Sequence, residues 1–321
     1  MNHTNIVKKI EVGSVEELFE LISPFGAYNS ILNGFVFRGE SSNSYKLLPS
    51  SLRLGNKKEL YDLSGMGMPI DNQSEWNYWQ IKTEYQCLRN FFINADNNGL
   101  KVPQVDRIRK SFNDIFGTTE IGFNNREKWI PNDLHELAAL AQHYDIPTRL
   151  IDWSYDCFIA LYFAATGALK KYKSDDCMVL WALNAYYLQF LQPTVSRIPL
   201  VFVKPPYSDN PNLHAQQGVL SFWETSIETT QDMIHNVCNI ERIPLDELLC
   251  MEVKKNNLTD FNKEEFYLMY KFEIPIIESH KLLDALHKLK YTGARIFPGY
   301  DGIRKYMNEK SIIDYEIFKK V

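Results

Sequence analysis

The stretch from Leu137 to Ala165 constrains the fold of this chain more than any other. Its sequence, LAALAQHYDIPTRLIDWSYDCFIALYFAA, places a polar and aromatic turn, a Pro-Thr-Arg corner and an Asp-Trp-Ser step between two apolar flanks. The flanks have the composition of buried helices, so the polar side chains between them are held close to a core. We therefore expect this stretch to form one wall of any functional site.

Strand and helix patterns alternate irregularly along the rest of the chain. Strands are predicted at 34–39, 177–183, 198–203, 214–222 and 266–274, and helices at 15–22, 76–92, 103–112, 134–144, 186–191 and 276–290. Residues 228–258 look helical in two pieces, and the segment around 312–318 has the alternation of a strand. Asp133 and Asp301 are expected to cap helices and Gly293 to end one. This order predicts an α+β fold: a single mixed domain with a central sheet and helical insertions.

Composition excludes several classes of protein. The 321 residues are 45% hydrophobic and carry a net charge of −5, which argues against a non-specific nucleic-acid binder but leaves a local basic groove open. No apolar run approaches the roughly 20 residues of a membrane span, and the start lacks the apolar segment of a signal peptide. The five cysteines are widely spaced without a CxxC. We expect a reduced, cytoplasmic protein with no membrane contact and no metal site.

Arg38 and Gly39 end the strand pattern GFVFRGE. Phe35 and Phe37 share one face of this strand, so Arg38 is expected to point the other way and to reach the rim of a cleft. Its guanidinium could clamp a phosphate or carboxylate, or it could form a structural ion pair with an acid such as Asp152. Gly39 would let backbone or a ligand approach closely.

Three further side chains of the central stretch are candidates, and two of them have two interpretations. His143 could act as a base or a hydrogen-bond donor to a ligand, or it could cap the carbonyls at the end of its helix. Tyr144 offers a ring for stacking. Arg149 could be a second guanidinium for a ligand or could form a local salt bridge with Asp152.

The Asp-Trp-Ser step and a later Gln pair complete the candidates. Trp153 offers a large stacking face, while Ser154 offers a hydroxyl or a cap for the helix that follows it. Gln216 and Gln217, next to a glycine that could form a bulge, could orient a ligand through their amides. No GxSxG elbow, P-loop, GxGxxG, HExxH or EF-hand pattern is present.

These segments resemble a known family. GFVFRGE followed by YKLLPSSLR, LAALAQHYDIPTRLIDWSYDCFIALYFA, HAQQGVLSF and ARIFPGYDGI are similar, in this order, to the FRG domain, named for its Phe/Tyr-Arg-Gly motif. The resemblance spans residues 34–303, with a predicted insertion at 223–262. It leaves an N-terminal helical segment, 1–33, and a C-terminal segment, 304–321. FRG proteins are bacterial or phage proteins that occur near defence or toxin genes.

The pattern is also distantly similar to the ADP-ribosyltransferase fold. In the Arg-Ser-Glu class of those enzymes, a strand ends in an aromatic-Arg-Gly, a Ser-Thr-Ser strand leads into a helix, and a later turn carries a Glu. This resemblance implies NAD as the substrate that donates ADP-ribose. Arg38, His143, Asp152, Ser154 and Gln217 would be the catalytic residues. NAD would be bound by Arg38, Gly39, Tyr144, Arg149, Trp153 and Gln216. The acceptor could be protein or nucleic acid.

The chain departs from the transferase pattern at the Glu, where it has Gln216 or Gln217. A neutral amide can hydrogen-bond a ribose but supplies no charge to a positively charged transition state. Either another acid takes over, with Asp152, Glu40 and Asp301 as the candidates, or the domain binds a nucleotide, a nucleic acid or a protein without catalysis. The resemblance therefore predicts an ADP-ribosyltransferase-like toxin or antiviral effector, with a non-catalytic binding module as the alternative.

Overall fold

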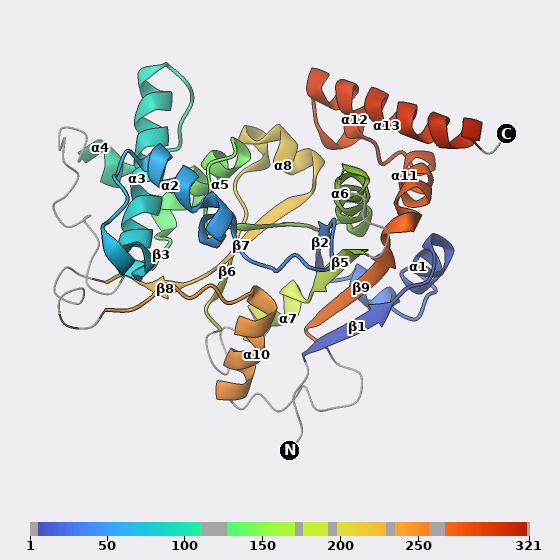
Figure 1. The fold of residues 1–321 in the computed structure, drawn as a ribbon, viewed down its shortest axis with the longest axis horizontal. Helices are drawn as coiled ribbons and strands as arrows, with labels where there is room; N and C mark the ends of the chain where they lie inside the picture. The colour runs from blue at the N-terminus through green and yellow to red at the C-terminus, as the bar shows by residue number, and fades with distance from the viewer. Residues whose placement is uncertain are drawn as a thin grey trace.

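A seven-stranded mixed sheet organises the molecule (Figure 1). The computed structural model describes residues 6–110, 127–170, 176–191, 198–228, 235, 237–256 and 267–319. The strand order is β1-β9-β5-β2-β4-β7-β6; β1 and β9 run parallel, and every other neighbouring pair runs antiparallel. The strands are β1 (Val7–Glu11), β2 (Val36–Glu40), β4 (Ile151–Ser154), β5 (Cys177–Leu183), β6 (Leu200–Val203), β7 (Gly218–Trp223) and β9 (Met269–Pro275). A two-stranded sheet pairs β3 (Lys128–Trp129) with β8 (Thr225–Ser226).

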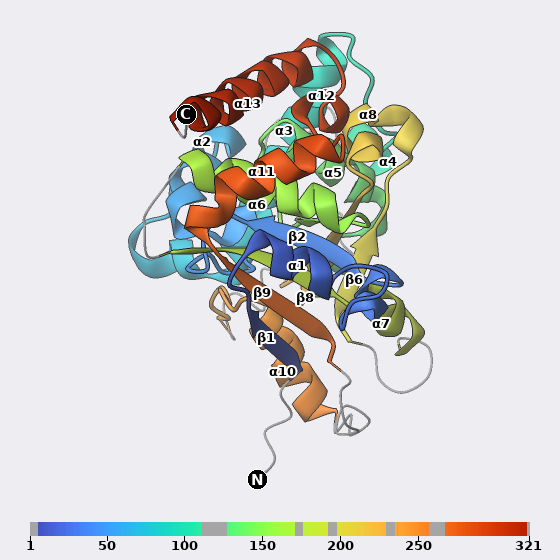
Figure 2. The ribbon, with the colours of Figure 1, turned by 90° about the vertical axis from the view of Figure 1, so that its right-hand side faces the viewer.

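Helices cover both faces of the large sheet. One face packs against α1 (Val15–Leu21), α6 (Cys157–Lys170) and α11 (Ser279–Lys288), which share a core with β2, β5 and β9. The other face packs against α7 (Ala185–Leu191) and α10 (Leu245–Lys255). Figure 2 shows α6 and α11 on one side of the sheet and α10 on the other. The α+β interpretation of the sequence agrees with this mixed architecture.

A third core lies at the β6–β7 end of the sheet. It holds side chains of α3 (Asn77–Asn97), α4 (Asp106–Lys110) and α5 (His135–His143) against β6 and β7. The shorter α2 (Lys57–Ser64) lies beside α3. The predicted cap of α5 is wrong, because Asp133 forms an ion pair with Arg107, with Nε 2.9 Å from Oδ2. The predicted helix at 103–112 begins only at Asp106.

Helix α6 sits unusually close to β2, and glycine makes this possible. A Cβ placed on Gly39 would lie 1.8 Å from the carbonyl oxygen of Ala160 in α6. Small residues run along the buried side of α6, including Ala160, Ala164 and Ala168. Because β2 has no side chain at position 39, helix and strand meet backbone to backbone. The close approach expected at Gly39 is therefore made by a helix of the same chain.

Strands β2 and β4 pair at one position only, where Phe37 lies opposite Ser154. By contrast, β2 pairs with β5 along its whole length, from Val36 to Glu40. The sheet therefore splits between β2 and β4 as β2 runs on toward Glu40. Such a split leaves backbone groups of both strands without ladder partners, and those groups need other partners.

The C-terminal region is helical. The short helix α12 (Gly293–Ile296) leads into the long helix α13 (Tyr300–Lys319), and α13 packs against α11 and α12. The predicted strand near 312–318 is wrong, and Gly293 begins α12 instead of ending α11. Asp301 lies inside the first turn of α13 and not before it. The predicted boundary at 303/304 falls within α13.

Other boundaries also differ from the sequence prediction. Residues 214–217 belong to α8 (Pro211–Ala215) and the turn after it, so β7 starts only at Gly218. The N-terminal segment contributes the edge strand β1 as well as α1. Within the predicted insertion, α10 buries Leu245, Leu249 and Val253 in the core. Parts of 228–258 lie outside the described residues. Across the described part of the chain, no helix has the length and hydropathy needed to span a membrane.

Candidate functional site

The split between β2 and β4 opens into a cleft of 360 Å³, which we call the Arg38 cleft. Its walls come from β2, β4, α5, α6, α8 and the turn after α12. The cleft is lined by Phe37, Arg38, Gly39, Ala139, Gln142, His143, Asp152, Trp153, Ser154, Ala160, Phe163, Asn210, Leu213, Gln216, Leu220 and Phe297. Most of the polar candidates named by the sequence thus meet in one place.

Arg38 spans the split. Its Nη1 donates to the backbone oxygen of Asp152 at 3.0 Å, and so supplies the partner that the missing ladder would have given. Its Nε lies 2.6 Å from Oε1 of Glu40, and Nη1 lies 3.8 Å from Oδ2 of Asp152. Burial acts to lower the pKa of Arg38, but Glu40 and Asp152 outweigh it and the pKa is raised. The guanidinium therefore stays charged at neutral pH.

The ion-pair interpretation of Arg38 is correct, but its closer partner is Glu40, which is buried, while Asp152 is exposed. Within the part of the chain that the structure describes, Nη2 of Arg38 donates to no protein acceptor. Arg38 thus holds the two strands together and still presents one edge of its guanidinium to the cleft.

A relay of hydrogen bonds fixes the orientation of Asp152. Gln142, at the end of α5, donates from Nε2 to Oδ1 of Asp152 at 2.6 Å. Its Oε1 accepts from the hydroxyl of Thr148, and that hydroxyl also accepts from the backbone N–H of Leu150 at 3.1 Å. The amide is therefore locked, and it holds a carboxylate whose side chain is 66% exposed.

The Pro-Thr-Arg corner is clamped by the Ser-rich segment that follows β2. The hydroxyl of Ser50 accepts from the N–H of Thr148 at 3.0 Å and donates to the Thr148 carbonyl at 3.1 Å. The N–H of Ser51 also donates to this carbonyl, at 3.0 Å. The sequence segments KLLPSSLR and IPTRL are thus two halves of one structure.

Ser154 joins β4 to the turn before β7. Its hydroxyl donates to the backbone oxygen of Gln216 at 2.8 Å and accepts from the N–H of Asp156 at 3.0 Å. The cap of α6 is Asp156, whose Oδ1 accepts from the N–H of Phe158 at 2.9 Å. The expectation that Ser154 caps the helix is therefore wrong, because the cap lies two residues further along the chain. Because its hydroxyl proton is donated to the carbonyl of Gln216, Ser154 holds the wall of the cleft in place.

A second cleft of 290 Å³, which we call the Arg53 cleft, shares Arg38, Gln142 and Asp152 with the first. It adds Arg53, Asn56 and Glu59 to the lining. The Nε of Arg53 donates to the backbone oxygen of Leu48 at 2.9 Å. Burial, and then the nearby charge of Arg38, lower the pKa of Arg53. Two guanidinium groups, of Arg38 and Arg53, therefore line the Arg53 cleft, an arrangement that suits an anion.

The remaining candidates are distributed around the rim. His143 is exposed, and its Nε2 lies 2.8 Å from Nδ2 of Asn212 on α8, so it connects α5 with α8. Tyr144 is 62% exposed and lines a different groove, beside Phe91. Gln217 has a φ of 46° and is a turn residue that does not line the Arg38 cleft. Of the Gln pair, only Gln216 reaches the cleft.

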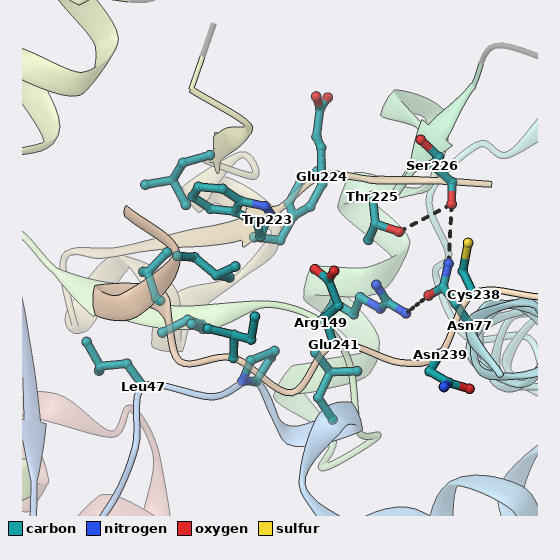
Figure 3. Close-up of a pocket in the computed structure, with 18 of the residues that line it drawn as sticks. Leu47, Asn77, Arg149, Trp223, Glu224, Thr225, Ser226, Cys238, Asn239 and Glu241 are labelled. Atoms are coloured by element: carbon teal, nitrogen blue, oxygen red, sulfur yellow. Dashed lines mark hydrogen bonds between the residues drawn. The ribbon is translucent and has the colours of Figure 1, made fainter. Parts of the chain in front are cut away.

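Arg149 and Trp153 are core residues. Arg149 is buried, and its Nε lies 2.8 Å from Oε2 of Glu84, so the predicted pair with Asp152 is wrong. Its Nη2 donates to Oδ1 of Asn77 at 3.2 Å, and Arg149 lines a separate pocket of 290 Å³. Figure 3 shows Arg149 and Asn77 among the residues of this pocket. Trp153 is only 3% exposed, and its Nε1 donates to the hydroxyl of Ser221 at 2.8 Å. Its ring leaves no free face for stacking.

Sequence reasoning missed several residues of the site. Gln142, Arg53 and Phe297 line the clefts, and none of them is among the site residues proposed from the sequence. Gln142 had a detectable signal, since a buried helix that ends in Gln-His-Tyr brings an amide next to the corner. The described residues include no group of three or more His, Cys, Asp or Glu placed to hold a metal ion.

Comparison with known families bears on the central stretch directly. Residues 33–173 match the family model of the FRG domain. This part of the chain is therefore similar to the FRG domain. The match includes Arg38, the Ser50 segment, Gln142 and the whole of β4 and α6, so the two clefts are built mainly from the matched residues. No curated protein and no solved structure matches the chain.

Proposed function

We propose that the Arg38 cleft binds NAD and that this protein transfers ADP-ribose to an acceptor, as an ADP-ribosyltransferase-like toxin or antiphage effector. One observation carries the proposal. Arg38 on β2, Ser154 on β4 and Gln216 before β7 belong to three neighbouring strands of the sheet and line the same cleft. These positions follow the Arg, Ser and Glu elements of the transferase class that the sequence resembles.

The donor set suits a dinucleotide. The free edge of Arg38 and the nearby Arg53 would hold the pyrophosphate, because guanidinium groups bind phosphate in a fork geometry. The Arg38 cleft and the Arg53 cleft, 360 and 290 Å³, meet at Arg38 and could take the two halves of an extended ligand. Volumes of this order are typical of small-molecule sites, which run from about 300 to 1,000 Å³.

When bound, NAD supplies an ADP-ribosyl group linked to a nicotinamide leaving group by a glycosidic bond. The chain's part is to provide negative charge where the sugar becomes positive. Asp152 is the carboxylate that lines both clefts, and Gln142 holds it in a single orientation. We assign Asp152 the role that a Glu has in the transferase class, with Gln216 contributing an amide.

Nicotinamide release from NAD tests this proposal, with Asp152→Asn as the decisive variant. The substitution removes the charge at a largely exposed position, so the fold is retained. We expect a decrease of about 100-fold or more, the typical cost of losing one preorganised electrostatic contact. The matched control is Asp62→Asn, which removes an exposed carboxylate of α2 that lines neither cleft and should leave the rate unchanged. A wild-type protein that releases no nicotinamide with protein or nucleic-acid acceptors would overturn the proposal.

A second function is favoured by the pairing of Arg38 with Glu40 at 2.6 Å. This pair offsets much of the positive charge at the cleft, and Gln216 supplies none of the negative charge that a transferase has there. A non-catalytic module would bind a nucleotide and release it unchanged. Recovery of intact NAD after incubation, together with measurable binding by calorimetry, would favour this alternative.

A further inference from the structure

The segment from Lys288 to Lys310 differs in charge from the rest of the chain. The whole chain has a net charge of −5, but this segment carries six Lys or Arg and two Asp or Glu, a net charge of +4. One of the two acids, Glu309, is buried and accepts hydrogen bonds from His287, Tyr162 and the N–H of Gly293. Lys288 pairs with Asp284 at 2.7 Å, so the exposed cations of α12 and the first half of α13 are Arg295, Arg304 and Lys310, with Lys305 half-buried beside them.

Aromatic rings lie among these cations, next to the Arg38 cleft. The Nζ of Lys305 lies 3.7 Å from the ring centre of Phe297, and Phe297 lines the cleft. Phe297 packs edge-on against Phe163 of α6, a second cleft residue, at 5.8 Å. Arg295 lies over the ring of Tyr291 at 4.0 Å. A basic and aromatic surface thus continues into the cleft wall.

Tyr300 extends this surface away from the cleft. It begins α13, only three residues after Phe297, and is 95% exposed. Arg304, one helical turn further on, is also exposed and lies on the same face of α13. Figures 1 and 2 both place α12 and α13 at the end of the molecule opposite α10. The contacts of the exposed Tyr300 ring with the described residues give it no structural role.

We propose that this surface, made of Tyr291, Arg295, Phe297, Tyr300, Arg304 and Lys305, binds single-stranded nucleic acid and directs it to the Arg38 cleft. Cations along a strand neutralise phosphates, and exposed rings stack on bases whatever their sequence. The part of this proposal that concerns delivery to the cleft rests on the proposed function, because it makes the nucleic acid the acceptor of ADP-ribose.

An acidic protein would satisfy the charges equally well, but it would not use the rings. Tyr300 is almost fully solvent-exposed, and the Phe297 ring is partly exposed beneath a cation. An exposed aromatic ring beside Lys and Arg, as at Tyr300, is the usual combination in proteins that bind single strands. One exposed carboxylate, Asp301, lies next to Tyr300 and limits the affinity.

The test is fluorescence anisotropy with a labelled single-stranded RNA of about 12 nucleotides, long enough for one such site. It is run without NAD, so that its failure can be told apart from failure of the proposed transferase function. We expect binding that weakens with salt, with a slope in log–log form of about −0.7 for each phosphate contacted. Tyr300→Ala should weaken binding about tenfold, by loss of one stacked base. Arg304→Glu should also weaken binding, and more strongly at low salt.

The matched control is Lys255→Glu, which makes the same change of charge at an exposed side chain of α10, at the opposite end of the molecule. It should bind as the wild type does. Absence of RNA binding, or equal affinity of the wild type and Tyr300→Ala, would overturn the proposal. So would a polyglutamate peptide that binds more tightly than RNA and displaces it from this surface. If RNA binds as expected but no nicotinamide is released, the assignment of this surface as an RNA-binding site is supported and the transferase proposal is refuted.

Discussion

Arg38 has two tasks at the scale of single residues. It donates a hydrogen bond to the carbonyl of Asp152 across the split sheet, and it forms an ion pair with the buried Glu40. The aromatic-Arg-Gly motif predicted a cation at a cleft rim, and this was correct. The motif could not reveal Glu40 as the partner, because a residue two positions along a strand faces the same side only if the strand stays regular there.

Replacement of Arg38 should cost stability as well as ligand binding. Arg38→Ala leaves the Glu40 carboxylate and the Asp152 carbonyl without their partner, and we expect a loss of about 2 kcal/mol in the free energy of unfolding. Adding Glu40→Gln should recover part of this loss, since the unpaired charge is then removed. Urea denaturation of the two single variants and the double variant gives the coupling. Strictly additive effects would show that the pair contributes nothing.

The buried pair of Arg149 and Glu84 offers a second residue-scale prediction. Both side chains are at least 94% buried, since 6% and 2% of them remain exposed. Glu84→Ala should destabilise the protein by about 3–5 kcal/mol, because it leaves the buried guanidinium of Arg149 without its carboxylate partner. Asp62→Ala, which breaks the exposed pair with Lys58, should cost about 0.5 kcal/mol or less. Similar losses for the two variants would contradict the assignment of Arg149 as a core residue.

At the scale of elements, the cleft depends on how α6 sits against β2. The sequence predicted both elements and their order. It did not predict that Gly39 accommodates the helix backbone, since the same glycine is equally suited to a ligand. Contacts between distant segments decide such a choice, and a single sequence does not display them.

Gly39→Ala should therefore destabilise the protein and distort the cleft. The new methyl group would lie 1.8 Å from the carbonyl oxygen of Ala160, so α6 must move. We expect the free energy of unfolding to fall by about 1–3 kcal/mol, which is typical of overpacking. Gly55→Ala is the control, because a Cβ there meets nothing within 4 Å. Thermal unfolding of both variants checks the prediction, and equal midpoints would refute the close contact.

The C-terminal helices show why the predicted strand at 312–318 was wrong. The short alternation of apolar residues suggested period 2, but the buried residues among positions 300–315 of α13 are Gly302, Glu309 and Ile313, which are spaced for a helix. Two of them are not apolar, so a hydrophobic pattern overlooks them. Glu309 holds α13 to α6, α11 and α12 through Tyr162, His287 and Gly293.

This carboxylate should make the C-terminal region sensitive to acid. Burial acts to raise the pKa of Glu309, but the hydrogen bonds from His287, Tyr162 and Gly293 outweigh it, and the folded pKa is lowered. A lowered pKa gives stability that is complete above the unfolded value and is lost as the pH falls through the folded value. Glu309→Gln should therefore destabilise the protein at pH 7, and its difference from wild type should shrink below about pH 4. A difference that stays constant with pH would contradict this role.

At the scale of the whole molecule, the sequence predicted a single mixed α+β domain, and the central sheet with helices on both faces agrees with it. The strand order was not predictable, because β1 and β9 pair across the full length of the chain. The candidate site was recovered in outline. The candidates that line one cleft are Arg38, Gly39, His143, Asp152, Trp153, Ser154 and Gln216, although the ring of Trp153 is buried. Arg149, Tyr144 and Gln217 lie in the core, in another groove and in a turn.

Thiol accessibility tests the overall packing. Cys87 and Cys157 are buried, and burial raises the pKa of each thiol to about 12, so both should resist alkylation in the folded protein. Cys238 is exposed and should react first. Mass spectrometry after a short treatment with iodoacetamide identifies the labelled sites. Early labelling of Cys157 would mean that α6 does not pack on the sheet as described.

Hydrogen–deuterium exchange in the presence and absence of NAD tests most directly whether the Arg38 cleft is the ligand site. We expect NAD to slow exchange in peptides that contain β2, the 142–154 segment and α8, with little change in α10. No change at saturating NAD would contradict the central claim. So would protection confined to 222–228 and 238–248, which would place the ligand in the pocket beside Arg149.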